Sequence, residues 1–190
     1  QTRDAYWRHG SVGDDWSRLT VPILAIGGWA DGYMNMVPAL VENAPVPVRG
    51  IIGPWVHLYP HMAVPGPRIG FLTEALAWWD RWLKGEGEVQ AGLYRYVQHS
   101  APPDACAGFR PGHWIGPGGV VEQRALSIGA DLTGPLPAAI ATPQHLGLAA
   151  GEYFPTGDHG EMPGDQAGDD ALSVTFDGPL LAEALTLAGA

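Results

Sequence analysis

Apolar positions in the first half of the chain follow the periods of strands and helices in turn. Residues 21–26 form an apolar run that is entered through Pro22 and closed by two glycines, which predicts a strand buried on both faces. Apolar residues then recur at three- and four-residue spacings over residues 33–43, as in a short helix. Residues 48–52 are a second apolar run. Strand, helix and strand in this order predict a βαβ unit.

The clearest helical pattern lies over residues 69–84. Its apolar side chains fall on one face, and we expect that face to pack on the sheet. Lys84 follows Asp80 by one helical turn, and Gly85 is placed to end the helix in a left-handed conformation. The stripe consists of Ile69, Leu72, Leu76, Trp79 and Leu83.

Beyond residue 92 the pattern favours β structure and loops over another βα unit. Residues 93–97 alternate as a strand does, and residues 101–119 are rich in proline and glycine. We expect a short strand around Leu126 and Ile128, a turn-rich connection over residues 129–151, and a strand over residues 172–176. The chain is therefore expected to hold an α/β region followed by a β region.

Charge divides the chain in a similar way. Residues 1–124 hold 11 acidic and 10 basic side chains, whereas residues 125–190 hold 9 acidic and no basic ones. No basic cluster is present, so nucleic acid is not an expected partner. No apolar stretch reaches the roughly 18 residues of a membrane span, so no membrane insertion is expected. Cys106 is the only cysteine and cannot form an internal disulfide.

Two polar residues stand where the predicted parallel strands end. Asp31 follows the first strand in GGWADG, and His57 follows the second in GPWVH. The carboxyl ends of adjacent parallel strands meet at one edge of a sheet, where α/β proteins form their sites. An acid that orients an imidazole, and an imidazole that moves protons, occur in this order in α/β-hydrolases. Asp31 and His57 are therefore a candidate catalytic acid and base.

Both residues also have a structural interpretation. An aspartate before a glycine commonly forms a turn, and a lone histidine after a strand is more often structural than catalytic. The pattern alone leaves both interpretations open.

Several segments around these residues form a recognisable set. They are residues 4–12 (DAYWRHGSV), 21–33 (VPILAIGGWADGY), 53–57 (GPWVH) with 59–61 (YPH), 75–85 (ALAWWDRWLKG), 110–114 (RPGHW) and 160–166 (GEMPGDQ). Together these segments resemble one known family, the CocE/NonD hydrolases, which are serine esterases related to Xaa-Pro dipeptidyl-peptidases and α-amino-acid ester hydrolases. The resemblance covers most of the chain.

The resemblance implies an α/β-hydrolase domain followed by a jelly-roll β domain. It implies that residues 1–88 are the end of the catalytic domain, and that residues 89–190 are a linker and the beginning of the β domain. It also implies that Asp31 is the triad acid, that His57 is the triad base, and that Tyr33 lines the acyl pocket. The substrate would be a small acyl ester or peptide, with no cofactor and no metal.

The chain departs from this family in lacking a nucleophile. An α/β-hydrolase carries its serine in a G-x-S-x-G turn upstream of the acid. Only Ser11 and Ser17 precede Asp31, and neither lies in such a turn after a buried strand. We therefore expect the chain to be the carboxyl-side portion of a longer enzyme, inactive by itself. The chain has no signal-peptide pattern and no initiator methionine, and we expect a cytoplasmic enzyme.

Other candidate sites are weaker. His57 and His61 have the spacing of a helical metal pair, but Pro60 disfavours a helix there. The acidic residues between 158 and 170 lack the alternation of a calcium loop and are expected to be solvated. Trp78, Trp79 and Trp82 are expected in the core, and Cys106 is expected to be inert.

Two classes of function remain open. The first is a serine hydrolase of acyl ester, amide or peptide bonds, of which this chain is a part. The second is a non-catalytic α/β and β binding module in which Asp31 and His57 are relics. The sequence leaves the substrate and the oligomeric state undetermined.

Overall fold

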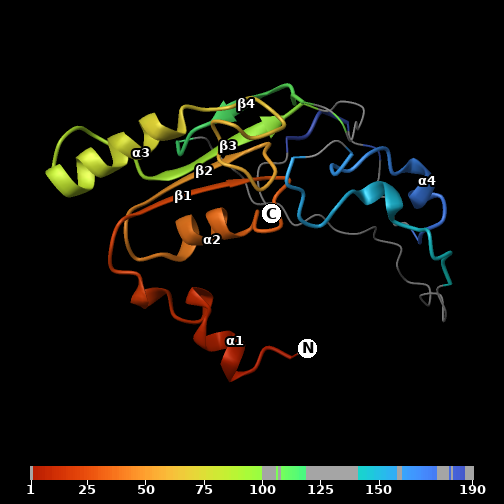
Figure 1. Ribbon diagram of the computed structural model, residues 1–190, viewed down its shortest axis with the longest axis horizontal. Helices are drawn as coiled ribbons and strands as arrows, with labels where there is room; N and C mark the ends of the chain where they lie inside the picture. Colours follow the sequence, from red (N-terminus) through yellow and green to blue (C-terminus); the bar gives the residue numbers. More distant parts are fainter. Residues whose placement is uncertain are drawn as a thin grey trace.

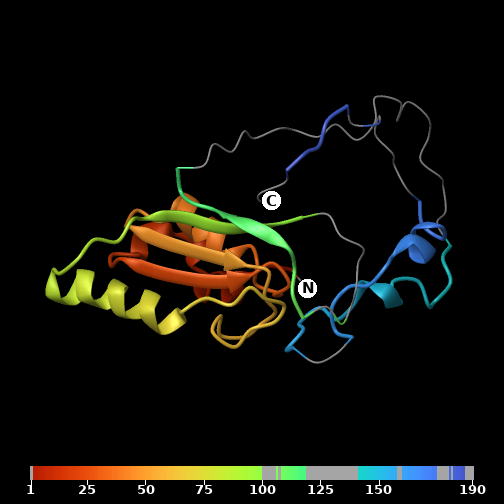
Figure 2. The ribbon, with the colours of Figure 1, turned by 90° about the horizontal axis from the view of Figure 1, so that it is seen from above.

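A computed structural model describes residues 2–99, 106, 108–118, 141–157, 160–174, 180 and 182–186. Within them, four strands form one open sheet in the order β1-β2-β3-β4 (Figures 1 and 2). The first three strands run parallel, and the last is antiparallel to its neighbour. The sheet is a mixed one, flanked by helices, and is compatible with an α/β fold. The strands are β1 (Ile23–Gly28), β2 (Val48–Gly53), β3 (Gly92–Gln98) and β4 (Gly112–Ile115).

The predicted βαβ unit is confirmed. Helix α2 (Met36–Asn43) connects β1 to β2, which pair in register from Ile23↔Val48 to Gly28↔Gly53. The helix begins three residues later than expected. Pro38 is its third residue, where the missing N–H would find no partner within the helix anyway. The core between α2 and the sheet consists of Ala25, Val37, Val48 and Ile52.

The predicted long helix is present as α3 (Phe71–Trp79), followed by one π-helical segment, η3 (Asp80–Lys84). It lies on the face of the sheet opposite α2 (Figure 1). Lys84 donates to Asp80 at 2.6 Å, and Gly85 ends the helix with φ 77°, as predicted.

The expected packing of this helix is wrong. Leu72, Leu76 and Leu83 of the predicted stripe are 72%, 59% and 75% exposed, whereas Trp78 on another face is 2% exposed. Glu74, one turn before Trp78, bonds Arg49 of β2 at 2.9 Å. The helix is apolar on more than one face. In the orientation that the structure shows, Trp78 is buried and Glu74 forms this ion pair. Trp79 and Trp82 are 53% and 37% exposed, so only one of the three tryptophans belongs to the core.

The second half of the chain adds two strands to the same sheet. β3 coincides with the predicted strand over residues 93–97, and β4 forms within the predicted segment of β and loop. Tyr96 of β3 is 3% exposed, and its backbone oxygen accepts a hydrogen bond from Trp29 Nε1 at 2.8 Å. The sheet thus continues past the expected domain boundary at residues 88 and 89.

The two ends of the described chain contain only short helices. They are α1 (Ala5–His9), η1 (Val12–Asp14) and η2 (Trp16–Arg18) before the sheet, and η4 (Leu148–Ala150) and α4 (Ala167–Asp170) after it. The strand expected over residues 172–176 does not start at Leu172, which lies in the turn after α4. The last residue of that expected strand, Phe176, lies outside the described residues. The strand expected at Leu126 and Ile128 also lies outside them. None of the helices described is long and apolar enough to cross a membrane.

Candidate active site

The two strand ends carry the candidate residues to one point. β1 and β2 finish level, because Gly28 pairs with Gly53. The loops that follow then cross closely: a Cβ on Gly28 would lie 1.9 Å from the backbone oxygen of Trp55. Ala30 N–H also donates to that oxygen, at 3.0 Å. The absence of a side chain at Gly28 therefore allows the two loops to bring Asp31 and His57 together.

Asp31 is held by the turn in which it lies. Its Oδ1 accepts a hydrogen bond from Tyr33 N–H at 2.9 Å, and its Oδ2 faces His57 Nδ1 at 2.9 Å. The side chain is 10% exposed. An Asp-Gly turn of this kind is the expected structural role, and here it also leaves the second carboxylate oxygen for the imidazole.

His57 uses one ring nitrogen for Asp31 and presents the other outward. Its side chain is 49% exposed, and in the described residues no partner bonds its Nε2. A carboxylate on Nδ1 keeps that nitrogen protonated and leaves Nε2 with the lone pair, so Nε2 is the atom that can accept a proton. The backbone N–H of His57 donates to Pro155 O at 3.1 Å.

Aromatic rings from distant parts of the chain surround the imidazole. The ring of Tyr33 lies 5.8 Å from that of His57, and Phe154 lies 4.4 Å from His57 and 5.4 Å from Tyr33. The pattern of the sequence did not single out Phe154, because residues 129–151 and their surroundings showed no periodicity. We call residues 152–157, which carry Phe154 and Pro155 to the site, the strap.

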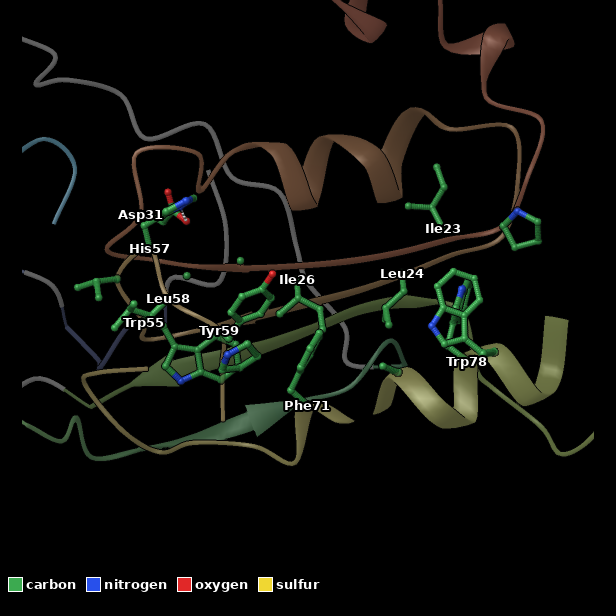
Figure 3. Close-up of a pocket in the computed structure, with 17 residues that line it drawn as sticks. Ile23, Leu24, Ile26, Asp31, Trp55, His57, Leu58, Tyr59, Phe71 and Trp78 are labelled. Carbon is green, nitrogen blue, oxygen red and sulfur yellow. Dashed lines mark hydrogen bonds and ion pairs between the residues drawn. The ribbon is translucent and has the colours of Figure 1, made fainter. Parts of the chain in front are cut away.

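A groove of about 770 Å³ extends from the Asp31–His57 pair along the face of β1 that looks toward α3 (Figure 3). Leu24 and Ile26 of β1 form one wall, and α3 contributes the other. The α3 residues that line it are Phe71, Ala75, Trp78 and Trp79. The groove is thus an apolar channel with one polar end, which is the usual character of a binding cleft.

Neither upstream serine belongs to the site. Ser11 accepts a hydrogen bond from Arg3, and Ser17 donates one to Asp15, and all four residues precede β1. The groove beside His57 is lined by neither of them. Asp31 and His57 are therefore brought together without a serine among the residues described.

The residues of the other candidate sites make contacts that are separate from one another. His57 bonds Asp31, whereas the ring of His61 stacks on Phe71 at 5.8 Å. In the part of the chain that the structure describes, no cluster of three or more His, Cys, Asp or Glu side chains could hold a metal ion. The carboxylates of Glu161, Asp165 and Asp169 accept hydrogen bonds from backbone N–H groups. Cys106 is exposed.

A comparison with protein families gives a match over the part of the chain that holds the pair. Residues 1–59 match the model of the X-Pro dipeptidyl-peptidase (S15) family. This segment includes β1, α2 and β2 and extends to both Asp31 and His57. No curated protein matches the chain. The match supports a relationship to this family for residues 1–59, and residues 60–190 lie outside it.

Proposed function

We propose that this chain supplies the acid and the base of a serine hydrolase that cleaves acyl ester bonds, or related amide and peptide bonds. Asp31 is the acid, His57 is the base, and the nucleophilic serine comes from a preceding segment. The observation that carries the proposal is the 2.9 Å contact of Asp31 Oδ2 with His57 Nδ1, which leaves Nε2 exposed in a groove. The family match over residues 1–59 supports a hydrolase.

The chemistry follows from the two ring nitrogens. Neutral His57 takes the proton of the serine hydroxyl at Nε2 while the serine oxygen bonds to the substrate carbonyl carbon. The imidazolium then gives that proton to the leaving oxygen or nitrogen as the bond to it breaks. Water repeats the same two transfers and releases the acid. Throughout, the Asp31 carboxylate keeps Nδ1 protonated and stabilises the positive ring.

An open strand edge and an exposed apolar stripe, both in the part of the chain that the structure describes, support the idea that another segment completes this fold. Ile23 N–H donates toward β2, to Pro47 O, so the alternate residues Leu24 and Ile26 direct their backbone polar groups to the open side of β1. A parallel strand that is apolar on both faces ordinarily lies inside a sheet. The stripe of Leu72 and Leu76 on α3 and Leu83 on η3 is likewise exposed. In our proposal the missing segment packs here and brings its serine to Nε2.

We also propose the domain organisation that the family resemblance implies. Residues 1–88 would be the end of the catalytic domain, and residues 89–190 a linker and the beginning of a jelly-roll β domain. Because β3 and β4 extend the sheet of β1 and β2, the junction would lie within one continuous sheet.

The same proposal assigns Tyr33 to the acyl pocket. Its side chain is 61% exposed, and its ring stands edge-on to that of His57. An aromatic ring beside the base suits an uncharged acyl group better than a charged one.

A fluorophosphonate probe tests the proposal, because it reacts with a serine only when a base activates that serine. We expect the complete protein, with its preceding segment, to be labelled, and this 190-residue chain to remain unlabelled. His57→Ala should abolish labelling of the complete protein. His61→Ala is the matched control, since His61 stacks on Phe71 away from Asp31, and it should label normally.

Two results would overturn the proposal in different ways. Labelling of this chain alone would show that it contains its own nucleophile. Equal labelling of the complete protein and its His57→Ala variant would remove His57 from the chemistry and favour the non-catalytic module.

A further inference from the structure

The strap lies tightly against the Asp31–His57 pair. The centroid of the Phe154 ring lies 4.4 Å from that of the imidazole, with the two rings tilted by 44°, and the Pro155 backbone oxygen accepts the His57 backbone N–H. A Cβ on Gly32 would lie 2.9 Å from Phe154 Cδ2, so the ring also fits closely over the Asp31 turn. The orientation of His57 therefore depends on Asp31 at one ring nitrogen and on the strap beside the ring.

No strand or helix among the described residues includes the strap. Its last two residues are instead held by one side chain. Glu161 Oε2 accepts hydrogen bonds from the backbone N–H groups of Thr156 at 2.6 Å and Gly157 at 2.7 Å. Its Oε1 accepts a further one from Thr156 Oγ1 at 3.2 Å. Hydrogen bonds to a carboxylate are stronger than those between neutral groups.

Glu161 also holds the other end of the strap. Its backbone oxygen accepts the N–H of Glu152 at 2.8 Å. Both ends of the six-residue strap are thus tied to one residue: the first end to its backbone and the last to its carboxylate. The ring of Phe154 lies between these two attachments.

We propose that Glu161 is a positioning residue that holds Phe154 and Pro155 against His57 through the strap. Without the carboxylate, the N–H groups of Thr156 and Gly157 would turn to water and the strap would lose its attachment at one end. The imidazole would then be free to rotate away from Asp31 on the side where Phe154 now lies. The catalytic consequence rests on the function proposed above for His57, whereas the position of the strap does not.

The position of the strap can be measured without catalysis. An aromatic ring whose centroid lies 4.4 Å from that of the imidazole shifts the NMR signals of the imidazole C–H groups. We would record these signals in the 190-residue chain with labelled histidine, and assign those of His57 from the His57→Ala variant. Phe154→Leu removes the ring and gives the reference change in the signals.

We expect Glu161→Ala to shift the His57 signals in the direction of Phe154→Leu. Glu161→Gln should keep them near their original positions, because one amide oxygen can still accept both backbone N–H groups. Glu152→Ala is the matched control. It removes an exposed carboxylate from the same strap while keeping the backbone bond to Glu161, and it should leave the signals unchanged. Unchanged His57 signals in Glu161→Ala, beside a clear change in Phe154→Leu, would overturn the proposal.

A kinetic experiment on the complete enzyme separates this proposal from the function on which it rests. Displacing a catalytic group by about 1 Å can cost about 10²-fold in rate, so we expect Glu161→Ala to lower kcat by about tenfold or more. Glu161→Gln should restore most of it. If the NMR signals respond to Glu161→Ala but the rate does not, the strap contact stands and its proposed effect on catalysis is wrong, whereas the role of His57 itself is tested by His57→Ala. If neither the NMR signals nor the rate respond, Glu161 has no positioning role, and the function proposed for His57 is unaffected.

Discussion

The α/β part of the molecule and its acidic carboxyl-terminal third contribute to the same site by different physical means. In residues 21–99, backbone pairing of parallel strands places Asp31 and His57. In residues 141–174, the described elements are two short helices, and carboxylates hold backbone N–H groups where strands and long helices would otherwise do so. This third still presents Phe154 to the imidazole. Strand pairing thus places the two candidate catalytic residues, and the carboxylate of Glu161 holds the segment that carries a ring to one of them.

The largest effect expected from this comparison is on catalysis in the complete hydrolase that we propose. Asp31→Asn keeps the shape of the side chain but places an amide beside His57 Nδ1, which favours the wrong tautomer. In serine proteases the same exchange lowers turnover by about 10⁴-fold, and we expect a loss of that order in kcat.

Phe154→Ala provides the counterpart from the strap. It removes a neighbour of the base but leaves the Asp31–His57 contact, so its loss should be smaller than that of Asp31→Asn. A loss below about tenfold for Asp31→Asn would remove Asp31 from the triad. A larger loss for Phe154→Ala than for Asp31→Asn would reverse our ranking of the two regions.

The second effect is on stability. Trp78 on α3 is 2% exposed, and replacing a buried tryptophan with alanine costs about 3–5 kcal/mol in the free energy of unfolding. Leu148 in the carboxyl-terminal third is 80% exposed, so Leu148→Ala should change this free energy by no more than about 0.5 kcal/mol. Urea denaturation of the chain measures both.

Leu76→Ala serves as a control within α3, because Leu76 is 59% exposed. If Leu76→Ala destabilises the chain as much as Trp78→Ala does, the helix faces the sheet with the stripe that the sequence favoured, and the observed orientation is incorrect.

The sequence predicted those elements whose period is local. The βαβ unit, the long helix, its glycine cap and the strand over residues 93–97 all follow from spacings within a few residues. The face of α3 that packs inward could not be predicted, because Phe71, Leu72, Leu76 and Trp78 give the helix more than one apolar face. In the observed orientation of the helix, Glu74 forms an ion pair with Arg49, which is distant in the sequence. A local period carries no information about such a partner.

The candidate site divides in the same way. Asp31 and His57 were predictable because each directly follows a strand, and strand pairing brings such positions together. Phe154 and Glu161 were not, since the strap reaches the site through side-chain contacts from nearly a hundred residues away. The acidic residues between 158 and 170, Glu161 among them, were expected only to be solvated. The structure instead shows carboxylates there that accept hydrogen bonds from the backbone.

A third, smaller effect concerns the close approach of the two loops. Gly28→Ala would force a Cβ to within 1.9 Å of the Trp55 backbone oxygen, and relieving such overpacking typically costs about 1–3 kcal/mol. Gly168 in α4 has nothing within 4 Å of an added Cβ, so Gly168→Ala should not lower stability. Thermal unfolding of the two variants compares them directly. Equal melting temperatures would contradict the tight crossing at Gly28.

The smallest effect is a pH dependence that distinguishes the sheet from the strap. Burial raises the pKa of Tyr96 on β3 above its usual value near 10, because the phenolate would lose its hydration. Its hydroxyl donates to Arg110 O at 2.7 Å. The folded chain therefore keeps this proton at a pH where the unfolded chain has released it.

This difference in proton binding fixes the sign of the dependence. The contribution of Tyr96 to stability is full below about pH 10 and is lost as the pH rises through the higher pKa of the folded state. Tyr96→Phe should lower stability at neutral pH by about 1 kcal/mol through the lost hydrogen bond, and it should flatten the alkaline decline. Tyr153 in the strap is 87% exposed, and Tyr153→Phe should leave the curve of unfolding free energy against pH as it is in the unsubstituted chain. A decline that persists unchanged in Tyr96→Phe would assign it to other groups and remove this distinction between the buried sheet and the exposed strap.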